Sequence, residues 1–294
     1  MGDEFIESRE FIRGAAKFHD LMYVISRDKK LVSKDIAHSS LIAIDQNDWG
    51  DAVDTNWNST AIAVAQKPKG KVVLVGEDGE AAAYLEGKST KEQISPAPVM
   101  IRNAREIGGY VYACGMKRQV YKRVAERQWV DISARRAGAK ESAGFEAIDG
   151  FTEDEIYAAG WAGEIWQYDG KAWTERPSPT NVILTAVCCA GDGTVYIAGR
   201  GGVLLKGRHD AWEIIKWEDE VNADLWDLCW YREKLYVATM LALFTLNKNT
   251  LVPAVFGKNA PHSFYSLTTA EDVLWSIGQS DVASFDGKKW KKHT

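Results

Sequence analysis

The stretch TVYIAGRGGVLLKGRHDAWEI, residues 194–214, shows the unit from which the chain is built. An apolar run that contains a tyrosine ends at Gly199, and a short glycine-rich turn leads into a second apolar run. A longer polar turn then precedes Trp212. Short apolar runs separated by turns of this composition are typical of neighbouring antiparallel strands.

The same pattern recurs along the chain. Similar segments occupy residues 21–41, 71–91, 110–130, 155–175, 234–254 and 272–292. The residue that ends the first apolar run falls at Ser26, Gly76, Gly115, Gly160, Gly199, Thr239 and Gly278, at intervals of 50, 39, 45, 39, 40 and 39 residues. Four of the units carry a tryptophan 12 to 14 residues later, at Trp129, Trp173, Trp212 and Trp290. The sequence therefore contains seven units with a period near forty.

Each unit holds four strand-like runs. In the fifth unit these are ILTAVCC, TVYIAG, GVLLKG and WEIIKW, joined by short connections rich in Gly, Asp and Asn. Four short antiparallel strands every forty residues are typical of a β-propeller blade, which buries its two faces against its neighbours in a ring. We predict an all-β fold: one propeller over residues 1–294, with seven four-stranded antiparallel blades. Six or eight blades are alternatives because the first unit is degenerate.

The tryptophans are expected to be structural. A tryptophan near the start of each fourth strand would pack between neighbouring blades, and the glycine would let the second strand turn tightly into the third.

This repeat resembles the broad BNR/YVTN/WD40-like group of β-propellers. The likeness covers nearly the whole chain and implies the fold alone. The GH…WD pattern of WD40 blades is absent, since Gly-His does not occur and Trp-Asp occurs once, at 226–227, and AGDGTVY at 190–196 does not match the Asp-box pattern. No activity is carried over from this group.

Composition excludes several classes of protein. A net charge of −5 argues against nucleic-acid binding, which needs a basic surface. The N-terminal MGDEFIESREFIRG lacks the apolar segment of a signal peptide, and no window is apolar enough to span a membrane. The four cysteines form no CxxC pair and lie in apolar runs, which indicates buried thiols. We expect a cytoplasmic protein with no nucleic-acid or membrane partner.

The surplus of about ten residues in the first interval draws attention to IDQNDWGDAVDTNW, residues 44–57. We interpret it as an insertion in the connection between the first and second blades. A second acidic stretch, WEDEVNAD at 217–224, would occupy the equivalent connection between blades five and six. Both are therefore predicted to lie on one face of the ring, where loops are free to bind partners.

This loop face carries the predicted function, a non-enzymatic, protein-binding propeller that acts as a scaffold. Acidic residues would meet a basic partner, and tryptophans would supply interface anchors. An immunity or antitoxin-like protein that blocks a toxin's basic active site is the concrete version. The candidate partner-binding residues are Asp45, Asp48, Trp49, Asp51, Asp54, Trp57, Trp161, Trp217, Glu218, Asp219, Glu220 and Asp224.

The sequence gives weaker support for metal binding and for catalysis. Residues 45–56 partly match a calcium loop, with Trp49 and Asn56 in place of ligands, so only a weak Ca²⁺ site is expected there, as in a metal-stabilised scaffold. No histidine pair has zinc spacing, and we expect no other metal or cofactor. The alternative function is a hydrolase or lyase that acts on a sugar or lactone in the central channel. Asp227 is its main carboxylate on the predicted lining strands, so no catalytic residue is assigned.

Overall fold

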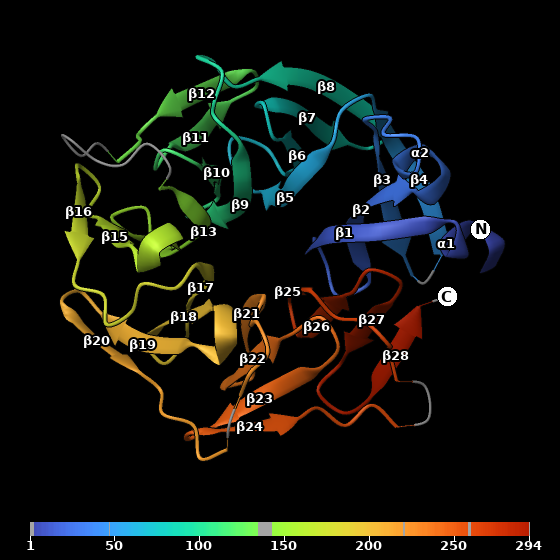
Figure 1. Cartoon of the computed structure of the whole chain (residues 1–294). Helices are drawn as coiled ribbons and strands as arrows, with labels where there is room; N and C mark the ends of the chain where they lie inside the picture. The colour runs from blue at the N-terminus through green and yellow to red at the C-terminus, as the bar shows by residue number, and fades with distance from the viewer. Residues whose placement is uncertain (1–2, 47, 135–142, 220, 258–259, 294) are drawn as a thin grey trace.

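Seven four-stranded antiparallel sheets stand around a common axis, as the blades of a propeller (Figure 1). The computed structural model describes residues 3–46, 48–134, 143–219, 221–257 and 260–293. Every sheet consists of four consecutive strands, so the predicted seven-bladed all-β propeller is confirmed.

The helices are short, and the strand bounds follow the repeat. Helices α1 (Asp3–Glu7) and α2 (Lys29–Val32) belong to blade 1, and the one-turn 3-10 helices η1 (Trp161–Gly163) and η2 (Arg200–Gly202) belong to blades 4 and 5. Blades 1 to 3 are β1 (Arg9–Ala16), β2 (Leu21–Asp28), β3 (Ser39–Asp45), β4 (Asp48–Thr55); β5 (Ser59–Ala65), β6 (Lys71–Gly76), β7 (Glu80–Leu85), β8 (Lys88–Gln93); β9 (Ile101–Ile107), β10 (Tyr110–Gly115), β11 (Val120–Ala125), β12 (Gln128–Asp131). Blades 4 and 5 are β13 (Phe145–Thr152), β14 (Glu155–Gly160), β15 (Ile165–Tyr168), β16 (Trp173–Arg176); β17 (Leu184–Cys189), β18 (Val195–Gly199), β19 (Leu204–Arg208), β20 (Ala211–Ile214). Blades 6 and 7 are β21 (Asp227–Tyr231), β22 (Lys234–Ala238), β23 (Leu243–Asn247), β24 (Thr250–Pro253); β25 (Ser266–Ala270), β26 (Val273–Ile277), β27 (Val282–Phe285), β28 (Trp290–His293).

The seams between blades form the core. Seven apolar clusters are present among the described residues, and each joins one blade to the next. The seam between blades 2 and 3, for example, packs Val73 and Val75 of β6 against Val111 and Ala113 of β10. Because the sheets do not pair with one another by strand hydrogen bonds, burial of apolar side chains in these seams is the main force that holds the ring together.

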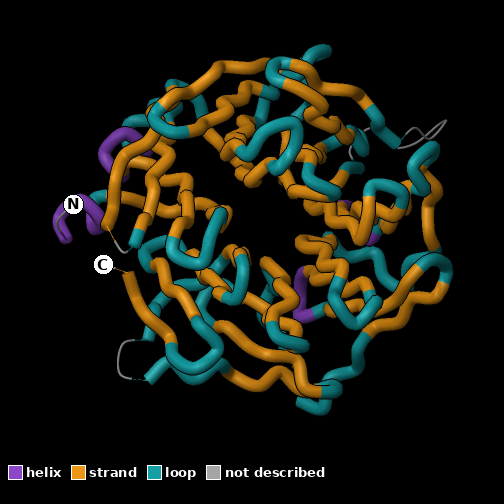
Figure 2. Tube along the Cα trace, turned by 180° about the vertical axis from the view of Figure 1, so that it is seen from behind, coloured by secondary structure: helices purple, strands orange, loops and turns teal. Residues whose placement is uncertain are grey.

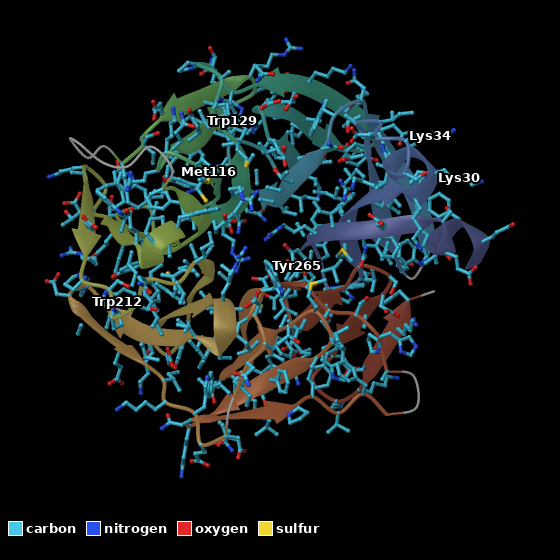
Figure 3. All side chains as sticks on the ribbon, viewed as in Figure 1. Lys30, Lys34, Met116, Trp129, Trp212 and Tyr265 are labelled. Carbon is cyan, nitrogen blue, oxygen red and sulfur yellow. The ribbon has the colours of Figure 1, made fainter. Side chains whose placement is uncertain are left out.

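The predicted role of the fourth-strand tryptophans is confirmed. Trp129, Trp173, Trp212 and Trp290 each pack in the seam with the preceding blade. The indole of Trp173 donates to the Ile132 carbonyl oxygen of blade 3 at 2.6 Å. Trp129 and Trp212 lie toward the outside of the ring, whereas Tyr265 lies near its axis (Figure 3).

The seam between blades 7 and 1 closes the ring. Phe11 and Trp49 of blade 1 pack there with Trp275 and Ile277 of blade 7. Phe5 and Ile6, within the N-terminal DEFIE segment that forms α1, cover the same cluster. Figures 1 and 2 both show the two termini close together at this seam.

The structure corrects the interpretation of residues 44–57. They are not an inter-blade insertion: Asp45 ends β3, and residues 48–55 form β4, the outermost strand of blade 1. Ile44 pairs with Trp49, and Ser39 pairs with Thr55. Trp49 is 7% exposed and stacks on Phe11 with ring centroids 5.5 Å apart. It therefore occupies the seam position that Trp129 and Trp212 hold in their blades.

The extra residues of the first unit lie between β2 and β3 instead. Helix α2 begins there, with Asp28 as its N-cap accepting from Lys30 N at 2.7 Å. His38 Nε2 accepts from Asp28 N at 2.7 Å and fixes the return of the chain into β3. Because this helical turn lengthens the connection before the third strand, more residues separate Ser26 from the seam tryptophan Trp49 than separate the equivalent residues in other blades.

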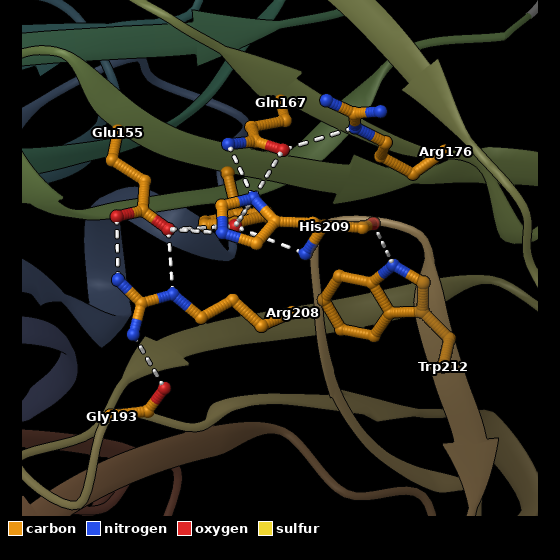
Figure 4. Close-up of polar contacts among 8 residues, drawn as sticks. Glu155, Gln167, Arg176, Gly193, Arg208, His209 and Trp212 are labelled. Carbon is orange, nitrogen blue, oxygen red and sulfur yellow. Dashed lines mark hydrogen bonds and ion pairs between the residues drawn. The ribbon is translucent and has the colours of Figure 1, made fainter.

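Polar contacts supplement the apolar packing of the seams. Between blades 4 and 5, the Arg208 guanidinium donates to both carboxylate oxygens of Glu155 at 2.8 and 2.7 Å (Figure 4). Within blade 5, the Trp212 indole donates to the His209 carbonyl oxygen. Between blades 2 and 3, Arg123 makes a two-pronged ion pair with Glu92, and both side chains are almost fully buried. Such pairs fix the relative orientation of neighbouring blades.

Among the described residues, no helix has the length and apolar character needed to cross a bilayer.

Truncation of the seam tryptophan should destabilise the fold. We expect Trp49→Ala to lower the free energy of unfolding by about 3–5 kcal/mol, because it empties a buried aromatic site in the closing seam. The matched control is Trp161→Ala. Trp161 is 37% exposed, so its removal should cost about 1 kcal/mol or less. Urea denaturation of both variants measures the difference, and equal losses would contradict the seam assignment of Trp49.

The closing blade also confers a pH dependence on stability. His293 is 6% exposed and stacks on Trp275, and burial lowers the pKa of His293 from 6.5 to about 4. The folded state therefore keeps this imidazole neutral, whereas the unfolded chain protonates it below pH 6.5. Stability that is present above pH 6.5 should be lost as the pH falls toward 4.

Urea denaturation at pH 7 and pH 5 measures this effect. We expect wild type to lose more free energy of unfolding between these two pH values than His293→Asn, which cannot titrate. Identical losses in the two proteins would show that His293 does not contribute.

Candidate functional site

The ring has two faces that differ in their loops. The first strands of all blades line the axis and run in the same direction. The entry face, as we call it, carries the connections from one blade to the next and those between second and third strands. The opposite face carries the turns between first and second strands and between third and fourth strands. Figures 1 and 2 view the ring from its two sides.

Asp45 and Asp48, from the first predicted acidic stretch, do not lie on the entry face, where the hypothesis places them. Asp45 and Asp48 are exposed at the turn between β3 and β4, on the opposite face. Gln46 N donates to the Asp20 carbonyl oxygen in the neighbouring turn of that face. Since this hairpin reverses the chain at Asp45, the two acidic stretches do not converge on one face as predicted.

Other members of the stretch are spread along β4 and beyond. Asp54 is exposed near the entry face and accepts from Ser40 Oγ at 2.6 Å. Trp57 is half-buried and packs in the seam between blades 1 and 2. The side chain of Asp51 and the whole of Glu220 lie outside the described residues. The chain at 45–56 is a hairpin rather than a continuous loop, so the carboxylates of Asp45 and Asp54 stand at opposite ends of β4.

The second acidic stretch does lie where the sequence places it, between β20 and β21. Trp217 packs in the seam between blades 5 and 6, and its indole donates to the Gly202 carbonyl oxygen at 2.7 Å. Asp224 accepts from Gly201 N at 2.8 Å, and Glu218 accepts from the Thr250 hydroxyl at 3.1 Å. These contacts hold the 215–226 loop between η2 of blade 5 and β24 of blade 6, and the exposed carboxylate of Asp219 takes no part in them.

Exposed apolar side chains gather on the entry face, which sequence reasoning largely missed. Among the described residues, seven of the eleven large apolar side chains that are exposed lie in its loops: Ile36, Val99, Met100, Trp161, Met240, Leu241 and Val255. Leu241 is 79% exposed and Val255 is 86% exposed. The signal in the sequence is the turn TMLA at 239–242, which is apolar where a turn is expected to be polar. Their presence on one face, with Met240 and Leu241 adjacent in one turn, makes this face a candidate interaction surface.

Some acidic residues of the opposite face accept hydrogen bonds within their own turns. Asp169 accepts from Lys171 N and Ala172 N, and Asp286 accepts from Lys288 N and Lys289 N, at 2.8–2.9 Å. These backbone hydrogen bonds lower the pKa of both carboxyls. Such aspartates shape the β-turns that contain them, which is a structural role. The opposite face thus offers acidic groups that stabilise turns, whereas the entry face offers apolar groups that the fold leaves exposed.

Polar side chains on the inner strands bridge neighbouring blades. Asp149 Oδ2 accepts from Cys189 N, and Asp227 Oδ2 accepts from Leu267 N, each at 2.8 Å and each forty residues along the chain. Asp227 also accepts from Leu228 N. Inner strands of different blades share no ladder, so these carboxylates satisfy amides that would otherwise be buried without partners.

Ion pairs between inner strands lie one blade further back, where Arg102 of β9 pairs with Glu146 of β13 at 2.9 Å. Arg105 of β9 stands 3.5 Å from Asp149 of β13. Desolvation alone would lower the pKa of Arg105, but the Asp149 and Asp227 carboxylates raise it, so the guanidinium stays charged. Asp149 and Asp227 are thus both used to hold the ring, which weakens the alternative of a carboxylate-based hydrolase or lyase in the channel.

Within the part of the chain that the structure describes, no three His, Cys, Asp or Glu side chains stand close enough to hold a metal ion. All four cysteines are free thiols. Burial raises the pKa of the Cys229 thiol to about 12 and raises the pKa values of Cys188 and Cys189 well above the usual value, which keeps them protonated.

One curated protein is similar to this chain over almost its whole length. The "Immune protein Tsi7" of Pseudomonas aeruginosa is 42% identical over 294 aligned residues, which cover 96% of each protein. No family model matches the chain.

Solved structures share the fold. "YCF48 bound to D1 peptide" superimposes with a TM-score of 0.68 at 14% identity and covers 92% of this chain and 90% of that one. The "WD40 beta propeller domain of Doa1" superimposes with a TM-score of 0.72 at 10% identity and covers 94% of this chain and 92% of that one. At these identities the likeness shows the propeller architecture alone.

The structural role of Asp227 is testable. We expect Asp227→Ala to lower the free energy of unfolding by about 1–3 kcal/mol, because it leaves the buried Leu267 amide without an acceptor. Asp227→Asn keeps one acceptor oxygen and should lose less. Chemical denaturation measures both changes. Wild-type stability in Asp227→Ala would instead mean that the carboxylate is free for another task in the channel.

Proposed function

This chain belongs to the family of the immune protein Tsi7, and from that premise we propose that it is an immunity protein that protects the cell by binding and blocking a toxin. Binding alone would suffice, so no reaction is assigned to the chain. We further propose that the complex forms in the cytoplasm and involves neither nucleic acid nor membrane. A cofactor or Ca²⁺ has no part in this mode of action.

The observation that carries the proposal is the exposed apolar surface of the entry face. Met240 and Leu241 extend from the β22–β23 turn, and Trp161 extends from η1 two blades away. A hydrogen bond supports each position: Phe264 N donates to the Met240 carbonyl oxygen at 2.9 Å, and the Trp161 indole donates to the Glu146 carboxylate at 2.6 Å. A preorganised apolar patch binds with a small loss of conformational entropy.

Charge would add specificity to this surface. Glu218, Asp219 and Asp224 lie in the 215–226 loop beside the β22–β23 turn, and they favour a partner whose contacting surface is basic. Opposite charges of this kind chiefly speed the encounter and suppress wrong partners. Asp45 and Asp48 lie on the opposite face and Trp49 is buried, so we no longer assign these three residues to the interface.

The test combines protection with binding. The probe is the protein encoded by the gene adjacent to that of this chain, since a toxin and its immunity protein must be inherited together. Wild-type chain should restore growth of cells that produce this protein and should copurify with it. Absence of both effects would overturn the immunity assignment.

Face-specific variants locate the interface. We expect Leu241→Glu to weaken binding at least about tenfold, because it places a charge in the apolar contact area. Phe18→Glu is the matched control, since Phe18 is 46% exposed on the opposite face, and it should bind within about twofold of wild type. Isothermal titration calorimetry gives both affinities. The reverse order of effects would place the toxin on the opposite face.

A further inference from the structure

A pocket of about 300 Å³ opens beside the apolar patch, between the 215–226 loop and the outer strands of blade 6. Its apolar walls are Trp217, Val221, Phe244 and Leu251, and Thr239 and Ala223 also line it. Figure 1 shows this loop leaving β20 and passing beside β23 and β24. Resting on the proposed function, we infer that this pocket receives one large apolar side chain of the toxin, flanked by a lysine or arginine.

The pocket is formed before any partner arrives. The Trp217 indole is fixed by its hydrogen bond to the Gly202 carbonyl oxygen, and Asp224 anchors the far end of the loop at Gly201 N. Val221 is pressed against Gly202 so closely that a Cβ at Gly202 would lie 2.0 Å from the Val221 carbonyl oxygen. The loop thus cannot collapse into the pocket without breaking these contacts, and a preformed pocket of this kind is where interface hot spots bind.

The charge on the rim of the pocket determines which toxin side chains can lie next to the inserted one. Asp219 lines the pocket and is exposed, and its carboxylate has no hydrogen bond or ion pair among the described residues. Glu218 precedes it in the chain, and only one Glu218 carboxylate oxygen accepts a hydrogen bond from the Thr250 hydroxyl. A cationic side chain next to the apolar one would neutralise this rim at little cost, whereas an acidic one would be repelled.

The pocket is continuous with the patch already assigned to the toxin. Thr239 lines the pocket, and its hydroxyl accepts from Leu241 N at 3.3 Å and from Ala242 N at 2.9 Å. The same residue therefore borders the pocket and shapes the turn that exposes Met240 and Leu241. One partner surface can cover both, with the pocket holding the anchor and the turn packing beside it.

Two variants test the pocket with the adjacent-gene protein as probe. Ala223→Trp places an indole at the pocket mouth, and Asp219→Lys reverses the charge of its rim. Each changes an exposed residue, so both proteins should keep the wild-type melting temperature. We expect each variant to weaken the Kd at least about tenfold.

Matched controls separate the pocket from general effects of size and charge. Ala172→Trp adds the same bulk on the opposite face, and Asp78→Lys makes the same charge change on the entry face at blade 2. Both should bind within about twofold of wild type. If Ala223→Trp binds like wild type while Leu241→Glu does not, the pocket inference fails and the proposed function stands. If the wild-type chain does not bind the probe at all, the proposed function itself fails.

Discussion

The whole molecule depends on packing between sheets that share no strand ladder. Within the described residues each blade consists of four consecutive strands, and none is completed by a strand from the other end of the chain. Closure rests on side chains in the seam between blades 7 and 1, where Phe11, Trp49 and Trp275 meet. A large aromatic group suits this task, because it spans the gap between two twisted sheets and buries much apolar surface.

This constraint leaves the two faces free to differ. Inner-strand carboxylates such as Asp149 and Asp227 tie neighbouring blades together, and aspartates of the opposite face shape its tight turns. Over most of their length, the loops of the entry face neither tie blades together nor shape tight turns. These loops can therefore expose residues such as Leu241 without destabilising the fold. In an immunity protein, such exposed loop residues are the ones that can change to recognise a toxin.

The repeat in the sequence predicts the number of blades and the seam positions of Trp129 and Trp212. The same repeat did not identify Trp49 as the seam tryptophan of blade 1. Helix α2 lengthens the connection between β2 and β3, and linear alignment assigned the surplus to the next irregular stretch along the chain. The aspartates at 45–54 then resembled a loop, although Asp48, Asp51 and Asp54 belong to β4 and pair with β3. The acidic 217–224 stretch was placed correctly because no insertion precedes it within its own unit.

The sequence by itself determined the architecture, because a forty-residue period of strands and turns is a local property that each unit repeats. It also indicated that protein binding was more plausible than catalysis, since no reactive constellation accompanied the repeat. Only the tertiary structure decided which acidic residues share a face, that Trp49 is core rather than surface, and that a pocket lies beneath the 215–226 loop. These properties depend on how residues far apart in the chain meet across a seam, and a one-residue change in strand register or a displaced helix alters them without changing the period.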